Sequence, residues 1–344
     1  MRTHTALASL AVLAAAVATP AHADVVIGPR VSYYFDNSNL RTSGIDSDLE
    51  EGVVLQPEDA AVLRAAFDQE PEFATRPESE GLRADQIGYT MVGAMINFGN
   101  DRDRFTLTAM YGSGEGDIEQ SAAFSRSLTL GDVQLVDIVN FTAQAVNKSD
   151  RLDLELTWQR RESESVAFLA GVRYERLDSS YEGSLRIVQG NSIPTLIAQA
   201  EAIVAGDPIP PGLPALPAIE ASVLQEGVIQ TYSARAGATA FVPFSEGGVA
   251  FFNGMLQASY RPDFDVLTVI DDPVGAFSGS DKSPEQGEFS IGPDFAVGAQ
   301  FILSQNLALD LRYRAVLFFP LSGAASFSDA RVNHGVNLGL SLRL

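Results

Sequence analysis

The last eleven residues of the chain alternate strictly between apolar side chains and side chains that are small or polar. The apolar residues take every second position, namely Val336, Leu338, Leu340, Leu342 and Leu344. A period of two places successive side chains on opposite faces of a β-strand. One face of this strand is therefore wholly apolar, which requires a sheet that buries one face in an apolar medium.

The N-terminus has the pattern of an export signal. Arg2 precedes an apolar run over residues 6–18, and an Ala-His-Ala motif follows at 21–23. A basic start, an apolar run and an A-x-A site are typical of a secretory signal peptide. We predict a signal peptide over residues 1–23 and an exported chain over 24–344. Beyond it no apolar stretch of about 18 residues occurs, so any further membrane crossing must use strands.

An exported chain that ends in such a strand resembles the Gram-negative outer-membrane β-barrel proteins, including the porins. The resemblance covers the exported chain as an architecture and indicates no subfamily. Those barrels usually end in an aromatic residue, whereas this chain ends in Leu344. The resemblance implies location in the cell outer membrane after signal-peptide cleavage, with outer-membrane lipid and lipopolysaccharide as partners. It also implies recognition of the C-terminal strand by the barrel-assembly machinery.

Read with a period of two, the exported chain predicts ten strands. They cover residues 25–35, 86–98, 104–112, 151–161, 166–178, 229–243, 249–260, 290–303, 307–319 and 332–344. Most are near the length of about 9–11 residues that a tilted strand needs to cross a bilayer. The predicted fold class is all-β, a single transmembrane antiparallel β-barrel of about ten strands. An even strand count leaves both termini of the exported chain on the periplasmic side.

The predicted connections alternate between short turns and long external loops, an asymmetry typical of these barrels. The long loops cover residues 36–85, 113–150, 179–228, 261–289 and 320–331. Apolar residues at helical spacing predict short helices within these loops at 57–67, 193–204 and 218–225.

The second long loop allows an alternative of twelve strands. Residues 121–130 and 133–141 have the pattern of a hairpin. If this hairpin crossed the membrane, Arg126 and Asp137 would lie on its apolar faces near the middle of the bilayer. Charges at that depth are costly. We therefore predict ten strands, with twelve as the alternative.

The charges of the chain separate according to this partition. The formal net charge is −21, and the five predicted loops hold 32 acidic residues against 10 basic ones. The rest of the exported chain holds 12 of each. The excess negative charge therefore lies in the predicted external loops. A chain this acidic is not expected to bind nucleic acid.

Aromatic residues gather near both ends of the predicted strands, as rings at the two membrane interfaces do. The outer ends carry Tyr33, Phe35, Tyr89, Tyr111, Tyr260 and Phe319. The inner ends carry Phe98, Phe105, Trp158, Phe168, Phe241, Phe252 and Phe301.

The polar faces of the predicted strands mix arginines with carboxylates. The candidates for the barrel interior are Arg30, Asp153, Glu155, Arg173, Glu175, Arg235, Asp294, Asp310, Arg312 and Arg314. Unpaired charges in a confined space are costly, so these groups are expected to form ion pairs or stay hydrated. One interpretation is a salt-bridge network that fills a narrow barrel, and the other is a charge-lined channel.

The residues that enzymes use are scarce. The chain has no cysteine, and His334 is the one histidine after residue 23. Omptin-type surface proteases are ten-stranded barrels that use a His–Asp pair with paired aspartates, and no His–Asp pair stands out here. We expect no catalytic residues, no enzymatic activity and no cofactor. Weak candidates for divalent cations at the loops are Asp46, Asp48, Glu50, Asp271 and Asp272.

The first function predicted from the sequence is a porin-like passive channel for small solutes. The alternative is a closed barrel with a structural or surface-binding role through its acidic loops. A surface enzyme is the least favoured of the three because the histidine count leaves few catalytic arrangements.

Overall fold

The computed structural model describes residues 24–36, 72–77, 87–130, 133–189, 219–271, 279–285, 287–321 and 330–344, with a few positions between 198 and 208. The predicted signal peptide at 1–23 and the predicted helix at 57–67 lie outside these residues. Among the described residues, no helix has the length and apolar content needed to span a bilayer.

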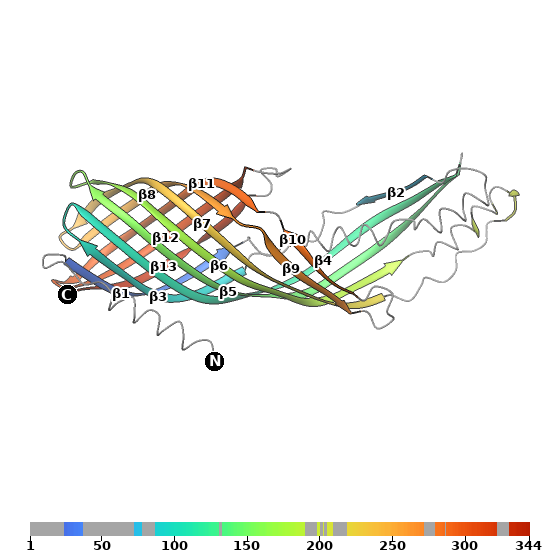
Figure 1. Ribbon diagram of the computed structural model, residues 1–344, viewed down its shortest axis with the longest axis horizontal. Helices are drawn as coiled ribbons and strands as arrows, with labels where there is room; N and C mark the ends of the chain where they lie inside the picture. Colours follow the sequence, from blue (N-terminus) through green and yellow to red (C-terminus); the bar gives the residue numbers. More distant parts are fainter. Residues whose placement is uncertain are drawn as a thin grey trace.

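Ten antiparallel strands close into a barrel (Figure 1). In order around the barrel they are β1 (Asp24–Asp36), β3 (Ile87–Gly99), β4 (Asp103–Leu130), β5 (Val133–Arg161), β6 (Val166–Gln189), β7 (Ile219–Ser245), β8 (Gly248–Arg261), β11 (Glu288–Ser304), β12 (Leu307–Pro320) and β13 (Arg331–Arg343). The last strand returns to the first through pairs such as Val31 with Leu338. Closure pairs the backbone groups of every strand, which lipid requires because it offers no hydrogen bonds.

These ten strands confirm the predicted fold class and the predicted strand count. The hairpin considered for a twelve-stranded barrel is formed by the distal parts of β4 and β5, which run on away from the barrel (Figure 1). Arg126 and Asp137 occupy opposite positions in its register. Ten strands therefore cross the membrane, and the charged hairpin stays outside it.

Beyond the outer end of the barrel the wall continues as an open sheet. β4, β5, β6 and β7 extend past their neighbours, and three further strands pair with them. β2 (Glu72–Pro77) pairs with β4, β9 (Phe264–Asp271) with β7, and β10 (Gly279–Glu285) with β9. We call this region the external sheet.

The external sheet corrects three of the predicted loops. Much of 113–150, 179–228 and 261–289 is strand, continuous with the barrel or paired to it. Apart from the hairpin considered at 121–130 and 133–141, these segments were predicted as loops, because strands outside lipid need no wholly apolar face and their period-two signal is weak. Within the predicted loop at 36–85, residues Glu72–Pro77 form the strand β2, which corrects this loop as well. Most of the rest of this loop and most of the loop at 320–331 lie outside the described residues.

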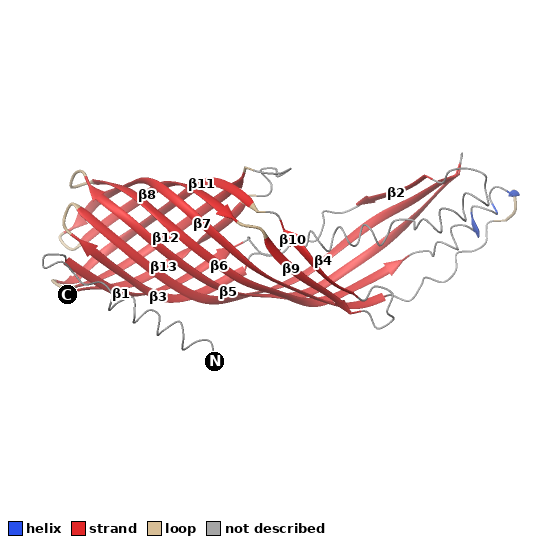
Figure 2. Cartoon of the chain, viewed as in Figure 1, coloured by secondary structure: helices blue, strands red, loops and turns tan. Residues whose placement is uncertain are grey.

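The prediction of helices in the external loops is corrected as well. Residues 218–225 were predicted as a helix, but from Ile219 onward they belong to β7 and pair with β6 and β9. A short apolar run does not distinguish a helix from a strand by spacing alone. Within the predicted helix at 193–204, residues 198, 199 and 202 have helical backbone. Strands dominate the described chain (Figure 2).

The outer wall of the barrel is apolar between two aromatic belts. Val172, Leu256 and Val297 are among its exposed side chains, at 56%, 59% and 52% exposure. Ring pairs lie at both interfaces, with Tyr260 on Phe289 at one end and Phe98 on Phe105 at the other; their ring centroids are 4.7 Å and 5.5 Å apart. Tyr89 was predicted to join the outer belt, but it is fully buried on the inner face of β3. The wall therefore has the surface chemistry of a protein that faces a bilayer.

The inner face of the barrel is filled by polar and charged side chains. Arg151 is the largest fully buried side chain, and Gln257, Asn147 and Asp36 are fully buried as well. Because alternate residues of a strand point to opposite faces, each apolar residue on the wall has polar neighbours inside. The core of this protein is thus the polar interior of a barrel.

Candidate functional site

The ten interior candidates predicted from the sequence all lie on the inner face of the barrel. They are carried by β1, β5, β6, β7, β11 and β12. Nine of them gather in three layers along the barrel axis, and Arg312 lies apart from these layers. We describe the layers from the end of the short turns, called the inner end, toward the external sheet.

The layer nearest the inner end joins β1 to β12 across β13. Arg30 forms an ion pair with Asp310 at 3.0 Å between nitrogen and oxygen. Gly339 lies between them in the register, and the Arg30 guanidinium occupies the space that a side chain at this position would take. The Ser341 hydroxyl donates to the same oxygen, with its Oγ 2.6 Å from Asp310 Oδ2.

The middle layer is built around two carboxylates that share two arginines. Asp294 accepts from Arg314 through both oxygens, at 2.8 Å and 2.6 Å, and from Arg235 at 3.0 Å. Glu155 pairs with the same two arginines. Thr157 accepts a further hydrogen bond from Arg235 at 2.6 Å. The layer connects β5, β7, β11 and β12 across the lumen.

The third layer is a chain of five charges between β1, β5 and β6. Arg173 donates to Asp153 through two nitrogens, at 2.9 Å and 2.5 Å, and lies 2.9 Å from Glu175. Arg151 pairs with Glu175 at 2.7 Å and with Asp36 at 2.6 Å. Each carboxylate therefore contacts an arginine.

Asp36 and Arg151 were not among the predicted interior residues, although the sequence contained the signal for both. Arg151 has the same parity as Asp153 in β5, and Asp36 has the same parity as Arg30 in β1. Both positions lie at the ends of the predicted strands, where the boundary between strand and loop is least defined.

Arg312 differs from the other interior arginines. Among the described residues, no carboxylate lies within ion-pair distance of its guanidinium, which stacks over the ring of Phe251 at 5.2 Å from the centroid. The three layers and Arg312 together hold six arginines and six carboxylates. The charges in the middle of the barrel therefore balance.

Above the charged layers the lumen is filled by an apolar cluster. It contains Ile87, Tyr89, Met91, Met110, Leu177, Ile229 and Val266, with Tyr34 and Phe264 packed against it. The two regions meet at Arg151, whose guanidinium lies over the rings of Tyr34 and Tyr89. Val266 of the external strand β9 belongs to this cluster, so the external sheet packs against the outer end of the lumen.

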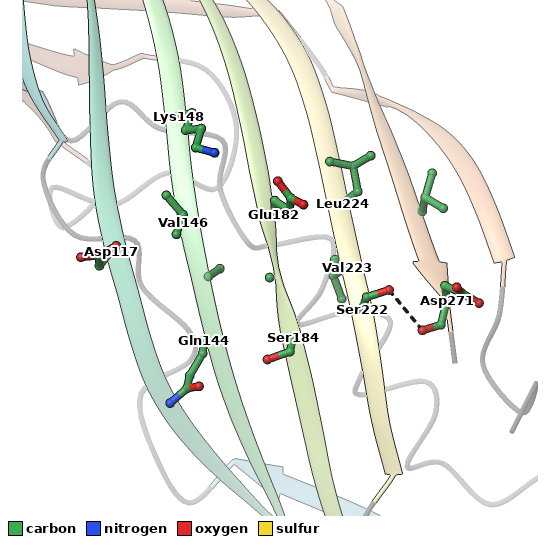
Figure 3. Close-up of a pocket in the computed structure, with 13 residues that line it drawn as sticks. Asp117, Gln144, Val146, Lys148, Glu182, Ser184, Ser222, Val223, Leu224 and Asp271 are labelled. Carbon is green, nitrogen blue, oxygen red and sulfur yellow. Dashed lines mark hydrogen bonds between the residues drawn. The ribbon is translucent and has the colours of Figure 1, made fainter. Parts of the chain in front are cut away.

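The outward face of the external sheet is hollowed where it leaves the barrel. One hollow of about 840 Å³ lies across β4, β5, β6, β7 and β9. Figure 3 shows Asp117, Glu182 and Asp271 around it, with Val146 and Leu224 between them. A second hollow of about 920 Å³ adjoins the first at Lys148 and lies closer to the aromatic belt.

Carboxylates outnumber basic groups in both hollows. Together they are lined by Glu115, Asp117, Asp150, Asp178, Glu182, Glu226 and Asp271, with Lys148 and Arg176 as the basic residues. We call this set the acidic hollow. On the opposite, inward face of the same sheet the side chains are buried, and burial raises the pKa of the Tyr181 hydroxyl above its usual range.

Asp271 was a weak candidate for a divalent cation. It lies at the end of β9 and is exposed, and its carbonyl accepts from the Ser222 hydroxyl. Within the described ranges, no cluster of three or more acidic, histidine or cysteine residues has the arrangement of a metal site. The other weak candidates, Asp46, Asp48, Glu50 and Asp272, lie outside those ranges.

His334 lies on the outer wall, as its position in β13 predicts. Its Nδ1 is 3.2 Å from the Tyr313 hydroxyl, and its ring stacks on Phe35 with centroids 5.4 Å apart. It belongs to the aromatic belt and faces away from the charged interior.

An antiparallel barrel with an apolar outer wall, two aromatic belts and a charged interior is a transmembrane β-barrel of the outer-membrane type. No protein-family model matches the chain, and no curated protein does. Among solved structures the chain is similar to the outer membrane protease OmpT from Escherichia coli, with 12% identity, 94% of this chain and 96% of that one covered, and a TM-score of 0.39.

Two further solved structures show the same distant similarity. The translocator domain of the autotransporter NalP from Neisseria meningitidis has 11% identity, with 99% of this chain and 95% of that one covered and a TM-score of 0.35. The attachment invasion locus protein Ail of Yersinia pestis has 14% identity, with 60% and 95% covered and a TM-score of 0.23. At these identities and scores the similarities carry no functional inference.

Proposed function

We propose that this protein is a closed outer-membrane barrel that acts at the cell surface by binding a partner through its external sheet. The proposal selects the surface-binding alternative over the porin-like channel that the sequence favoured first. It is supported by a filled lumen and by the strands that continue outside the bilayer.

The observation that carries the proposal is the paired interior of the barrel. The three layers and Arg312 hold six arginines and six carboxylates, and five of these arginines have a carboxylate within 4 Å. Nearer the outer end, Arg331 pairs with Glu288 at 3.0 Å and the Arg261 guanidinium lies over the ring of Phe264. An eight-stranded barrel is about filled by its own side chains, whereas sixteen strands leave an aqueous channel. Ten strands with large paired side chains and an apolar cluster above them favour a closed barrel.

The external sheet supplies the second line of support. Its strands reach well past the rest of the barrel (Figure 1), and ordering so many exposed residues costs conformational entropy. Long external loops are usual in such barrels, but here the barrel strands themselves continue beyond the wall and pair with further strands. We infer that the external sheet is retained because it presents a surface to the outside of the cell.

The proposed role involves neither catalysis nor a cofactor. The single histidine of the exported chain lies on the outer wall beside Tyr313 and Phe35, away from the carboxylates of the lumen. The proposed location is the outer membrane of a Gram-negative cell, in contact with lipid and lipopolysaccharide, after assembly through the C-terminal strand.

Planar-bilayer conductance of the refolded exported chain tests the closed barrel. Heat-modifiable gel migration first confirms that the material is folded, and a general porin in the same bilayers shows that channels are detected. We expect no discrete current steps. Reproducible steps would instead support a channel, and a changed ion selectivity in an Arg312→Gln/Arg314→Gln variant would then assign these arginines to the pore.

A further inference from the structure

We propose that the acidic hollow binds an extended cationic peptide segment in which lysine or arginine alternates with apolar residues. The inference rests on the proposed surface-binding function and specifies its partner. It is carried by the charge of this sheet face, by the order of residues across its strands, and by its place next to the membrane.

The carboxylates of the acidic hollow are mostly unneutralised. Asp178 pairs with Arg176 at 2.8 Å. Among the described residues, no ion pair within 4.0 Å joins the other six carboxylates or Lys148, and all seven of these side chains are exposed. An open surface with this excess of negative charge attracts a polycation.

The sheet register sets two carboxylates against each other. Asp150 of β5 lies directly opposite Asp178 of β6, and like charges at opposite positions destabilise a sheet. Arg176 bonds Asp178 and leaves Asp150 without an ion pair among the described residues. A cationic side chain placed over this pair would relieve the repulsion, so binding here gains more than at isolated surface carboxylates.

Apolar side chains lie between the charged ones in the same register. One row across five strands reads Asp117, Val146, Glu182, Leu224 and Val269. The apolar members of the row are half-buried and the acidic members are exposed. A ligand complementary to this row alternates cationic and apolar side chains, as an extended peptide with a period of two does.

The position of the hollow favours a peptide over a divalent cation. The carboxylates are spread along rows over five strands, and the described residues offer no clustered metal site. The hollow begins beside Tyr33 of the aromatic belt and extends away from the bilayer. A water-soluble polycation therefore reaches it without entering lipid.

The test uses the full exported chain in phosphatidylcholine nanodiscs and a fluorescein-labelled ten-residue peptide of alternating lysine and leucine, with empty nanodiscs as background. The target variant is Asp150→Asn/Glu182→Gln/Glu226→Gln. The matched control is Asp101→Asn/Glu164→Gln/Glu246→Gln, which makes the same change of net charge on the exposed turns at the inner end. Fluorescence anisotropy gives the dissociation constants, and heat-modifiable migration verifies that each variant is folded.

We expect the target variant to bind the peptide about tenfold more weakly, because each exposed charge pair contributes up to roughly 1 kcal/mol. The control variant should bind like the wild type, and a block peptide of the same composition should bind less tightly than the alternating one. Equal weakening in both variants, or unchanged binding in the target variant, overturns the proposal. If the protein conducts in bilayers but the target variant still loses peptide binding, only the closed lumen is refuted. If the protein does not conduct but the target variant binds like the wild type, only the peptide site is refuted.

Discussion

At the scale of single residues, Asp294 is the most constrained charge in the protein. Its side chain is fully buried and is held by Arg314 through both oxygens and by Arg235 through one. Burying an ion costs several kcal/mol, and only close, hydrogen-bonded partners offset this cost. The middle layer satisfies that condition because four strands deliver their charges at one level of the barrel.

Replacing Asp294 with Asn should therefore strongly destabilise the barrel. The change leaves two buried arginines with one remaining carboxylate, and breaking a buried pair in this way costs roughly 3–5 kcal/mol. The free energy of unfolding in urea, followed by gel migration, measures the effect. The control is Glu162→Gln, which breaks the exposed pair with Arg160 and should cost less than about 1 kcal/mol. Similar losses in both variants would contradict the role assigned to the middle layer.

At the scale of elements, each barrel strand separates lipid from the polar interior by alternation alone. In β8, Leu256 is 59% exposed on the wall, whereas the adjacent Gln257 is 1% exposed and lies inside. A charge placed on the wall would face hydrocarbon, and the cost depends on depth in the bilayer. The face and the depth of a strand position therefore predict whether a charged substitution there is tolerated.

Leu256→Arg should lower the stability of the folded barrel by about 2–4 kcal/mol, because this position lies near the middle of its strand. Val242→Arg is the matched change near the inner turn, where the cost falls to about 0–1 kcal/mol. Both residues are similarly exposed, at 59% and 60%. Refolding into lipid vesicles with urea titration compares them, and equal costs would mean that the wall does not face a bilayer at Leu256.

The distal hairpin of β4 and β5 should be dispensable for barrel formation. Gln120 and Ala143 lie opposite each other, so an Asn-Gly turn can join them and remove residues 121–142. The shortened chain should show the same heat-modifiable migration as the full chain. It also keeps Asp117, Val146 and Lys148 of the acidic hollow, so peptide binding should persist. Failure to fold would show that the barrel requires the hairpin.

At the scale of the whole molecule, stability depends on closure between the first and last strands. β13 pairs with β1 on one side and with β12 on the other, and the Leu344 N–H donates to the Val25 carbonyl at 3.0 Å. Without β13, two strand edges would face lipid. Unpaired backbone groups in hydrocarbon cost several kcal/mol each.

Deleting residues 331–344 should therefore abolish barrel formation in vesicles. The expected result is complete loss of the heat-modifiable band and full digestion by added protease. The shortened β4–β5 hairpin variant, which loses more residues but no barrel pairing, provides the comparison. A protected, heat-modifiable band from the truncated chain would contradict closure by β13.

The predictions from the sequence agree with the structure inside the bilayer and differ from it outside the bilayer. Within the bilayer, alternation predicted all ten strands and placed the ten interior candidates on the inner face. Outside it, the sequence indicated the hairpin at 121–130 and 133–141 only as an alternative, and the strand at 219–228 was missed, because water allows polar residues such as Ser222 and Glu226 on the outward face. The buried position of Tyr89 was also missed, since aromatic rings near strand ends serve both the belts and the interior.

The sequence by itself determined that the chain forms a barrel, which strands cross and which face of each strand meets lipid. These properties follow from a local period of two imposed by the bilayer. Only the tertiary structure decided the charge partners, such as Arg314 with Glu155, which are 159 residues apart. It alone also placed the carboxylates of the external sheet in rows. The ion pairs and the rows of carboxylates both depend on the register of strands around a closed barrel. No local sequence pattern specifies that register.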